Sequence, residues 1–245
     1  MAAKVFSVTA AYDAQIAHYL DPEPFPEQFT PTYHKRQDLR YGENSHQQAA
    51  FYVEPNPDPT SLAAAKQLHG KELSYNNIKD ADAALAMLRE FKQPAAVAVK
   101  HMNPCGIGLG DTLEAAWDKA YAADPMSIFG GIIALNRRVD LATAEKMHKL
   151  FLEIIMAPAF DDDAYEILAK KKNVRLLTIN TADTPEELGT ETTSIYGGLL
   201  IQTRDDKAET PADMTVVTEV KPTEAQLKAL AFAQTVVKHV KSNAI

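Results

Sequence analysis

Apolar positions along the chain follow two patterns that alternate from about residue 81 onward. In one pattern apolar residues recur three and four positions apart, as in an amphipathic helix, and in the other four to six consecutive residues are mostly apolar, as in a buried strand. The helical segments are 81–91, 113–123, 142–151 and 161–172, and the apolar runs are 95–99, 131–135, 154–157 and 174–179. This alternation predicts an α/β fold in which helices cover a sheet.

The segments on either side of this alternation are less regular. Residues 9–20 predict a helix, which the prolines at 22, 24 and 26 end, so that an extended connector follows. Residues 195–202 predict a further strand, and residues 223–237 predict a helix that Thr223 caps. The polar or proline-rich stretches 54–60, 180–191 and 204–213 are expected to be loops.

Composition narrows the class of protein. The 245 residues include 25 Lys and Arg against 33 Asp and Glu, and the net charge of −8 argues against broad nucleic-acid binding, which needs a basic face. No apolar run approaches the roughly 18–20 residues of a membrane-spanning helix, and the first residues do not resemble a secretory signal. The single cysteine, Cys105, allows no intramolecular disulfide. We therefore expect a cytoplasmic protein that binds neither nucleic acid nor membrane.

The densest polar cluster is Leu-Arg-Tyr-Gly-Glu-Asn-Ser-His-Gln at 39–47. The guanidinium of Arg40 and the hydroxyl of Tyr41 are good donors to a phosphate. The same residues also suit a turn exposed to solvent, and composition alone does not separate the two interpretations.

A second cluster, Lys-His-Met-Asn-Pro-Cys-Gly at 100–106, directly follows the apolar run 95–99. Open α/β sheets bind ligands at the carboxyl ends of their strands, so this position favours a site. His101 can move a proton near neutral pH, and Lys100 can stabilise developing negative charge. The alternative is a surface pair, and whether both side chains face one cleft depends on where the strand ends. Zinc-deaminase chemistry needs a His-x-Glu and a second cysteine, which are absent, so we expect no metal and a packing role for Cys105.

A third cluster, Asp-Pro-Met-Ser-Ile-Phe-Gly-Gly, occupies 124–131. Phe129 could stack on a flat heterocycle, and the glycine at Gly130 lets a ligand approach the backbone closely. A turn between helix and strand, with Phe129 in the core, explains the same residues equally well. The amides of Asn76 and Asn77 can read a carboxamide, although alone they are typical of a turn.

Taken in order, these clusters, with Leu-Ser-Tyr-Asn-Asn at 73–77 and Lys-Ser-Asn-Ala at 241–244, resemble the transformylase part of a bifunctional purine biosynthesis family. That family joins AICAR transformylase to IMP cyclohydrolase. The resemblance runs from about residue 33 to the last residue. It divides the chain into a closing cyclohydrolase helix with linker (1–32), a first transformylase subdomain (33–221) and the start of the following segment (222–245).

The resemblance implies transfer of a formyl group from 10-formyltetrahydrofolate to the 5-amino group of AICAR. It also implies a zinc-free, cytidine-deaminase-like three-layer α/β fold with helices on both faces of the sheet, and a homodimer with composite active sites. A structural potassium ion is a further candidate component. By motif, the catalytic residues are Lys100, His101 and Asn243, and the substrate-binding residues are Arg40 and Tyr41 (phosphate), Asn77, Phe129, Gly130 and Glu153.

The sequence also departs from the family pattern. Ser45 stands where proline is common, and most of the cyclohydrolase domain and of the second transformylase subdomain have no counterpart here. We therefore expect a fragment that carries half of a site and turns over little on its own. A nucleotide-binding or dimerisation module without activity, and a zinc-free deaminase-like hydrolase, are the alternatives.

Overall fold

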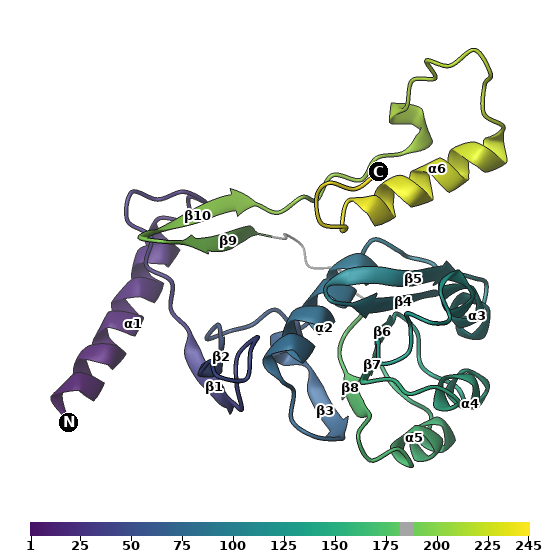
Figure 1. The fold of residues 1–245 in the computed structure, drawn as a ribbon. Coiled ribbons are helices and arrows are strands. Elements are labelled where there is room, and N and C mark those ends of the chain that lie inside the picture. Colours follow the sequence, from purple (N-terminus) through teal and green to yellow (C-terminus); the bar gives the residue numbers. More distant parts are fainter. Residues whose placement is uncertain (182–188) are drawn as a thin grey trace.

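The centre of the protein is a six-stranded mixed sheet. We describe residues 1–181 and 189–245 of a computed structural model. The strands lie side by side in the order β3-β8-β7-β6-β4-β5 (Figure 1). They are β3 (Lys66–His69), β4 (Ala95–Lys100), β5 (Asn103–Leu109), β6 (Ile132–Leu135), β7 (Ile154–Ala157) and β8 (Arg175–Thr178). Strands β6, β7 and β8 are parallel, whereas β3, β4 and β5 run antiparallel to their neighbours.

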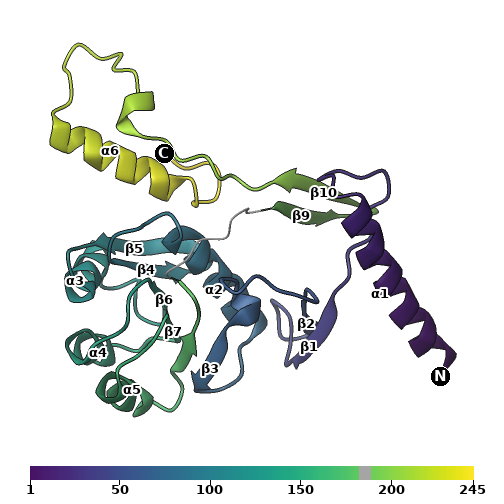
Figure 2. The ribbon, with the colours of Figure 1, turned by 180° about the vertical axis from the view of Figure 1, so that it is seen from behind.

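Helices cover both faces of this sheet. Helix α2 (Tyr75–Leu88) lies on one face, and α3 (Leu113–Ala123), α4 (Leu141–His148) and α5 (Asp162–Ala169) lie on the other (Figures 1 and 2). Side chains alternate across each strand, so β4 sends Val97 and Val99 toward α2 and Ala96 and Ala98 toward the other three helices. The expected α/β fold with three layers is confirmed.

The strands and helices of the apolar alternation are all present; α3 and β7 have the predicted bounds, and the others have shifted ends. Helix α2 begins six residues before the predicted residue 81, because Ser74 caps it in a reciprocal pair with Asn77. Strands β3 and β5 were not predicted. Pro104, Gly106 and Gly108 make β5 resemble a loop, but β5 is the edge strand of the sheet, where proline is tolerated. A Cβ on Gly108 would lie 2.0 Å from the carbonyl oxygen of Ala116, so these glycines let α3 approach β5.

Several elements lie outside the sheet. They are α1 (Ala2–Leu20), the antiparallel pair β1 (His34–Leu39) and β2 (Ala49–Val53), the hairpin β9 (Thr190–Ile195) and β10 (Gly198–Thr203), α6 (Glu224–Val237) and two short 3₁₀ turns, Leu62–Ala64 and Pro211–Asp213. The strand predicted at 195–202 is found as β10 at 198–203, but its start is wrong, because Gly197, with φ +78°, turns the chain after Ile195, the last residue of β9. The predicted loop at 180–191 is partly strand at 190–191, and its residues 182–188 lie outside the described residues.

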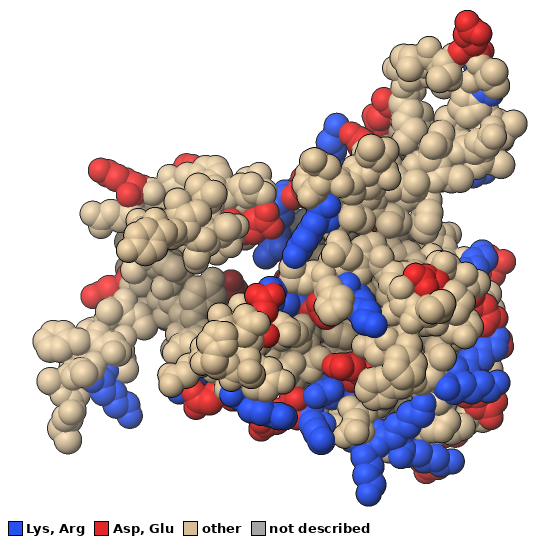
Figure 3. Space-filling model, viewed as in Figure 1, with Lys and Arg blue, Asp and Glu red and all other residues tan. Residues whose placement is uncertain are grey.

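Among the described helices, none is both long and apolar enough to cross a membrane. On the face in Figure 3, Lys and Arg atoms lie among Asp and Glu atoms.

Candidate functional site

Three of the predicted site residues, Lys100, Phe129 and Glu153, lie at one end of the neighbouring strands β4, β6 and β7. Strand β4 ends at Lys100, and because β4 is antiparallel to β6, this end lies beside the amino end of β6. The Lys100 Nζ donates to the carbonyl oxygen of Phe129 over 3.1 Å, and the Glu153 amide donates to that of Gly131 over 3.0 Å. The cluster is therefore at the carboxyl end of β4, as expected, but at the amino ends of the parallel strands. The rule for parallel sheets does not explain its position, because β4 runs the other way.

His101 lies in a tight turn that joins β4 to β5. Lys100 pairs with Asn103 across the hairpin, so His101 and Met102 are the two turn residues, with φ of 56° and 60°. Both residues have a left-handed backbone conformation, which glycine and asparagine adopt most readily and which costs other residues roughly 1–2 kcal/mol each. Two side chains hold the turn: Asp80 Oδ1 accepts from the Met102 amide at 2.7 Å, and Asn103 Nδ2 donates to the His101 carbonyl at 3.0 Å. The imidazole of His101 is exposed.

Asn77 joins the start of α2 to Glu153. Its side-chain Oδ1 accepts from the Ser74 amide at 3.2 Å, and its Nδ2 donates to Glu153 Oε2 at 2.7 Å. The guanidinium of Arg175 lies 3.8 Å from the same oxygen of Glu153. Asn77 is buried, and both the oxygen and the nitrogen of its side-chain amide bond within the protein, so it holds the carboxylate of Glu153 at the amino end of β7.

Phe129 offers an open aromatic surface. Its ring packs against Phe151 with 5.5 Å between centroids, yet the residue is 56% exposed. The core residue of this turn is instead Ile128, which is fully buried, so the interpretation of Phe129 as a core residue is wrong. Gly130, with φ +74°, donates its amide to the Phe151 carbonyl at 2.8 Å. A ring held from one side and exposed on the other can stack on a flat ligand.

Arg40 and Tyr41 lie on the loop between β1 and β2. The Gly42 amide donates to the Gln47 carbonyl at 2.9 Å and closes this loop, and the Arg40 guanidinium lies 5.9 Å from the centre of the Tyr41 ring. A polar groove of about 550 Å³ runs along this loop and strand β2; the residues that line it include Lys35, Arg40, His46, Gln47 and Tyr52. Lys100 and His101 do not line this groove. One link between the loop and α2 is an ion pair of 3.7 Å between Glu43 and Lys79.

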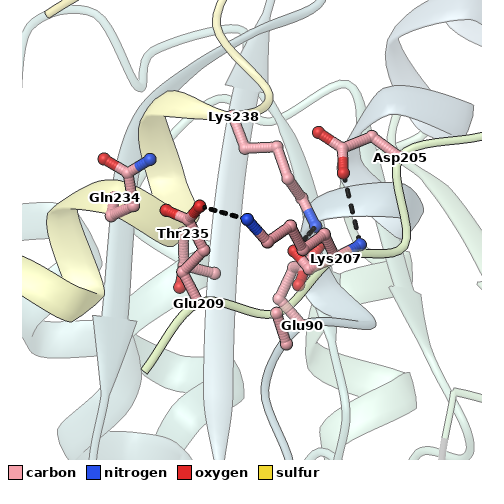
Figure 4. A pocket seen from close by; sticks show the side chains of 8 residues that line it. Glu90, Asp205, Lys207, Glu209, Gln234, Thr235 and Lys238 are labelled. Carbon is pink, nitrogen blue, oxygen red and sulfur yellow. Dashed lines mark hydrogen bonds and ion pairs between the residues drawn. The ribbon is translucent and has the colours of Figure 1, made fainter. Parts of the chain in front are cut away.

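The segment that carries Asn243 follows α6 and contacts the β4–β5 hairpin. The Lys241 amide donates to Asn103 Oδ1 at 3.4 Å, and Ser242 Oγ donates to Asn243 Oδ1 at 3.1 Å. Upstream, Glu90 accepts from Lys238 at 2.7 Å and from His239 at 2.8 Å. Glu90 and Lys238 also line a pocket of about 190 Å³ between α6 and residues 205–209 (Figure 4). The contact with the hairpin that carries His101 is therefore made by Lys241, two residues before Asn243 in the chain.

The hydrogen bonds of the third cluster hold its turn together. Asp124 accepts from the amide and the hydroxyl of Ser127, and these bonds hold the pKa of its carboxyl below the ordinary value. Cys105 is partly buried and its thiol donates to the Ala98 carbonyl at 3.4 Å. Burial raises the pKa of the Cys105 thiol, which favours packing over nucleophilic chemistry.

The sequence alone did not identify four polar residues of this site: Asp80, Glu90, Asn103 and Arg175. One signal was available, because Asp80 follows Asn77 by three positions and so shares its helix face. Among residues 1–181 and 189–245, no group of three or more His, Cys, Asp or Glu side chains is arranged to hold a metal ion. The potassium ion stays a prediction.

Comparison with known proteins gives a consistent result. The whole chain, residues 1–245, matches the family described as the AICARFT/IMPCHase bienzyme. It is 89% identical over 245 residues to the bifunctional purine biosynthesis protein PurH of Lacticaseibacillus casei and 69% identical to that of Lactiplantibacillus plantarum. The PurH of Listeria monocytogenes is 61% identical over 248 residues. In each case the match covers all of this chain but 48% of the relative, so the chain spans about half the length of these proteins. The chain belongs to the AICARFT/IMPCHase bienzyme family.

Proposed function

We propose that this chain acts in purine biosynthesis and carries the nucleotide half of a formyl-transfer site. The reaction is transfer of a formyl group from 10-formyltetrahydrofolate to the 5-amino group of AICAR. One observation carries the proposal. Lys100, the strained turn of His101 and the exposed ring of Phe129 lie together at the end of β4. Family membership and the names of the relatives support it.

The reaction requires three kinds of assistance. The amine of AICAR is attached to a carboxamide-bearing ring, so its lone pair is delocalised and it attacks weakly. Catalysis must orient the amine, accept its proton, and stabilise the negative charge on the formyl oxygen as a tetrahedral centre forms.

The residues at the sheet edge suit these roles. The exposed imidazole of His101 accepts the proton of the attacking amine, directly or through the carboxamide. Lys100 has three N–H donors and uses one on the Phe129 carbonyl, so two stay available for the formyl oxygen or the departing folate nitrogen. Phe129 stacks on the base beside Gly130, Arg40 and Tyr41 bind the phosphate, and Asn243 orients the carboxamide.

The folate side of the site is expected from the part of the relatives that this chain does not match, or from a second copy in a homodimer. The cytoplasmic location belongs to the same proposal. A second candidate function is a nucleotide-binding or dimerisation module without turnover. The observation that favours it is the large apolar surface on the elements outside the sheet, where Phe6, Tyr12 and Tyr19 are all more than half exposed.

Calorimetric titration of AICAR into the purified chain tests the nucleotide half. We expect micromolar binding that weakens when the ligand lacks its phosphate and when Arg40 is changed to Ala. Arg138→Ala is the matched control, because Arg138 is an exposed arginine paired with Asp161 outside the site. Equal affinity for AICAR and its dephosphorylated nucleoside would contradict the phosphate assignment.

Turnover is tested in a protein of full family length, made by replacing the matching segment of the Lacticaseibacillus casei relative with this chain. Because a general base contributes about 10²–10⁴-fold, His101→Ala should lower kcat by that order. His18→Ala, an exposed histidine on α1, should not. A loss below about tenfold would remove His101 from the role of base. Binding of AICAR without any turnover in the unmodified protein would favour the second candidate function.

A further inference from the structure

Helix α2 sends two polar side chains from one face to two parts of the site. Asn77 and Asp80 are three positions apart and so lie on the same side of the helix. Asn77 holds Glu153 at the amino end of β7, whereas Asp80 accepts from the Met102 amide at 2.7 Å in the turn that carries His101. The contact that the structure gives Asp80 is with the backbone of the turn, through its Oδ1.

The turn needs such a partner. His101 and Met102 are both left-handed without being glycine or asparagine, and a turn of this kind persists only when its surroundings hold it. The Asp80 carboxylate supplies a charge-assisted hydrogen bond from a helix that packs on the sheet, and such bonds are about twice as strong as neutral ones. Asn103 adds a second bond, to the His101 carbonyl, and its other side-chain atom accepts from the amide of Lys241.

We infer that Asp80 is a positioning residue for formyl transfer, which holds His101 in its left-handed conformation by binding the amide of Met102. The inference rests on the proposed function and adds a residue to it. Asp80 donates and accepts no proton in the reaction and does not touch the substrate. Its effect is on the fraction of molecules whose imidazole points to the amine, so its loss should lower kcat and leave nucleotide binding nearly unchanged.

The test compares four forms of the protein of full family length: unchanged, Asp80→Ala, Asp80→Asn and Asp82→Ala. Loss of a hydrogen bond to a charged group corresponds to about a 10- to 100-fold change in an equilibrium. We expect Asp80→Ala to lower kcat by at least about tenfold on that basis, with the KM for AICAR changed less than about twofold. Asp80→Asn keeps an acceptor oxygen at the same place and should recover most of kcat. Asp82→Ala removes the same charge from an exposed position on the same helix and should behave like the unchanged protein.

A second measurement does not depend on activity. Hydrogen exchange at the Met102 amide should accelerate by about tenfold or more in Asp80→Ala and not in Asp82→Ala, because its acceptor is lost. Met102→Gly removes the left-handed strain at that residue, so Asp80→Ala should cost less kcat in a Met102→Gly background than alone. If Asp80→Ala does not fold, Asp80→Ser, whose hydroxyl is one bond shorter than the carboxylate, takes its place in every arm.

The outcomes separate two failures. If the unchanged protein transfers no formyl group, the proposed function fails, and the exchange measurement still decides whether Asp80 holds the turn. If the unchanged protein is active and Asp80→Ala keeps its kcat and its amide protection, the inference is wrong. An equal loss in Asp80→Asn and Asp80→Ala would also overturn it, because the carboxylate would then act by its charge and not by holding the Met102 amide.

Discussion

The sheet region and the elements outside it differ in where they place their apolar side chains. Helix α3 has 11 residues and buries four of them, including Trp117, between itself and the sheet. Helix α6 has 14 residues and buries none, and α1 buries only Ala14 of its 19 residues. Both outer helices nevertheless carry many apolar side chains, such as Phe6 and Leu230, which are 72% and 51% exposed.

The difference shows that one part of the chain has its own core and the other does not. Amphipathic helices in proteins are stabilised mainly by packing of their apolar face, and exposed apolar patches of this kind mark interaction surfaces. The homodimer expected from the family resemblance would supply such a surface, and it stays a prediction. The two parts touch near the candidate site: Lys100 ends β4, Phe129 and Glu153 precede β6 and β7, and Lys241, beyond the end of α6, bonds to Asn103.

The largest expected effect on stability is in the sheet core. Trp117 is 2% exposed and stacks on Tyr121, so Trp117→Ala leaves a cavity and should lower the free energy of unfolding by about 3–5 kcal/mol. Leu230→Ala on α6 should change it by about 0.5 kcal/mol or less. Urea denaturation followed by circular dichroism measures both. Similar losses in the two variants would mean that the two regions share one core.

The contact between β5 and α3 gives the next largest effect. An added methyl at Gly108 would lie 2.0 Å from the Ala116 carbonyl oxygen, and backbone must move to admit it, so Gly108→Ala should destabilise the protein by about 1–3 kcal/mol or more. In Gly198→Ala on β10 the nearest atoms are side-chain carbons of Ile195 at 3.4 Å. That control should stay within about 0.5 kcal/mol of the unchanged protein in the same denaturation experiment. A tolerated alanine at Gly108 would contradict the close approach.

A smaller and local effect should appear at low pH, where α6 meets α2. Burial alone would raise the pKa of Glu90, but hydrogen bonds from His239 and Lys238 outweigh it and hold that pKa below its ordinary value. A lowered folded-state pKa contributes stability that is present above the unfolded pKa and is lost as the pH falls through the folded one. Protection of residues 238–241 from hydrogen exchange should therefore decrease on acidification below the ordinary pKa of a glutamic acid.

Glu90→Gln is the control for this pH effect. It removes the titrating group, so residues 238–241 should be less protected at neutral pH and should lose their dependence on acid. The same acid dependence in Glu90→Gln would show that another group anchors the end of α6.

The smallest effect on stability is expected on the outer hairpin. Leu200 on β10 is 59% exposed, and Leu200→Ser should change the free energy of unfolding by no more than about 0.5 kcal/mol. If this surface contacts a second copy, the same change should weaken self-association in sedimentation experiments. A loss above about 2 kcal/mol in the monomer would show that the hairpin has a core contact in this chain.

Local sequence patterns were sufficient to predict the helices and strands that pack on elements close to them in the sequence. The apolar runs of β4, β6, β7 and β8 and the apolar stripes of their helices predict a layered α/β fold, because the spacing of apolar residues in the sequence matches the positions that each element buries. They did not predict β1, β2, β3 or β5, or the turn at Gly197 that separates β9 from β10. Proline and glycine in β5 resemble a loop unless the edge position of the strand and the close approach of α3 are known.

The site divides in the same way. The sequence motifs were sufficient to identify six candidate residues that the structure brings to the same end of the sheet. They are Lys100, His101, Asn77, Phe129, Gly130 and Glu153. The sequence did not show where β4 ends; in the structure Lys100 is its last residue and His101 is the first residue of the turn. The catalytic and substrate-binding roles of all these residues, and of Arg40, Tyr41 and Asn243, stay predictions. Arg40 lies in a separate groove, and the contact with Asn103 is made by Lys241, two residues before Asn243.

The sequence by itself determined the type of fold and the residues that could do chemistry, because both depend on residue type and on spacing along a helix or strand. The tertiary structure decided which of these residues face one another. Strand direction placed the cluster at the amino ends of the parallel strands, and a contact across 22 positions, from Asp80 to Met102, fixed the turn that carries His101. Such contacts join elements that are distant in the chain, and no local period records them.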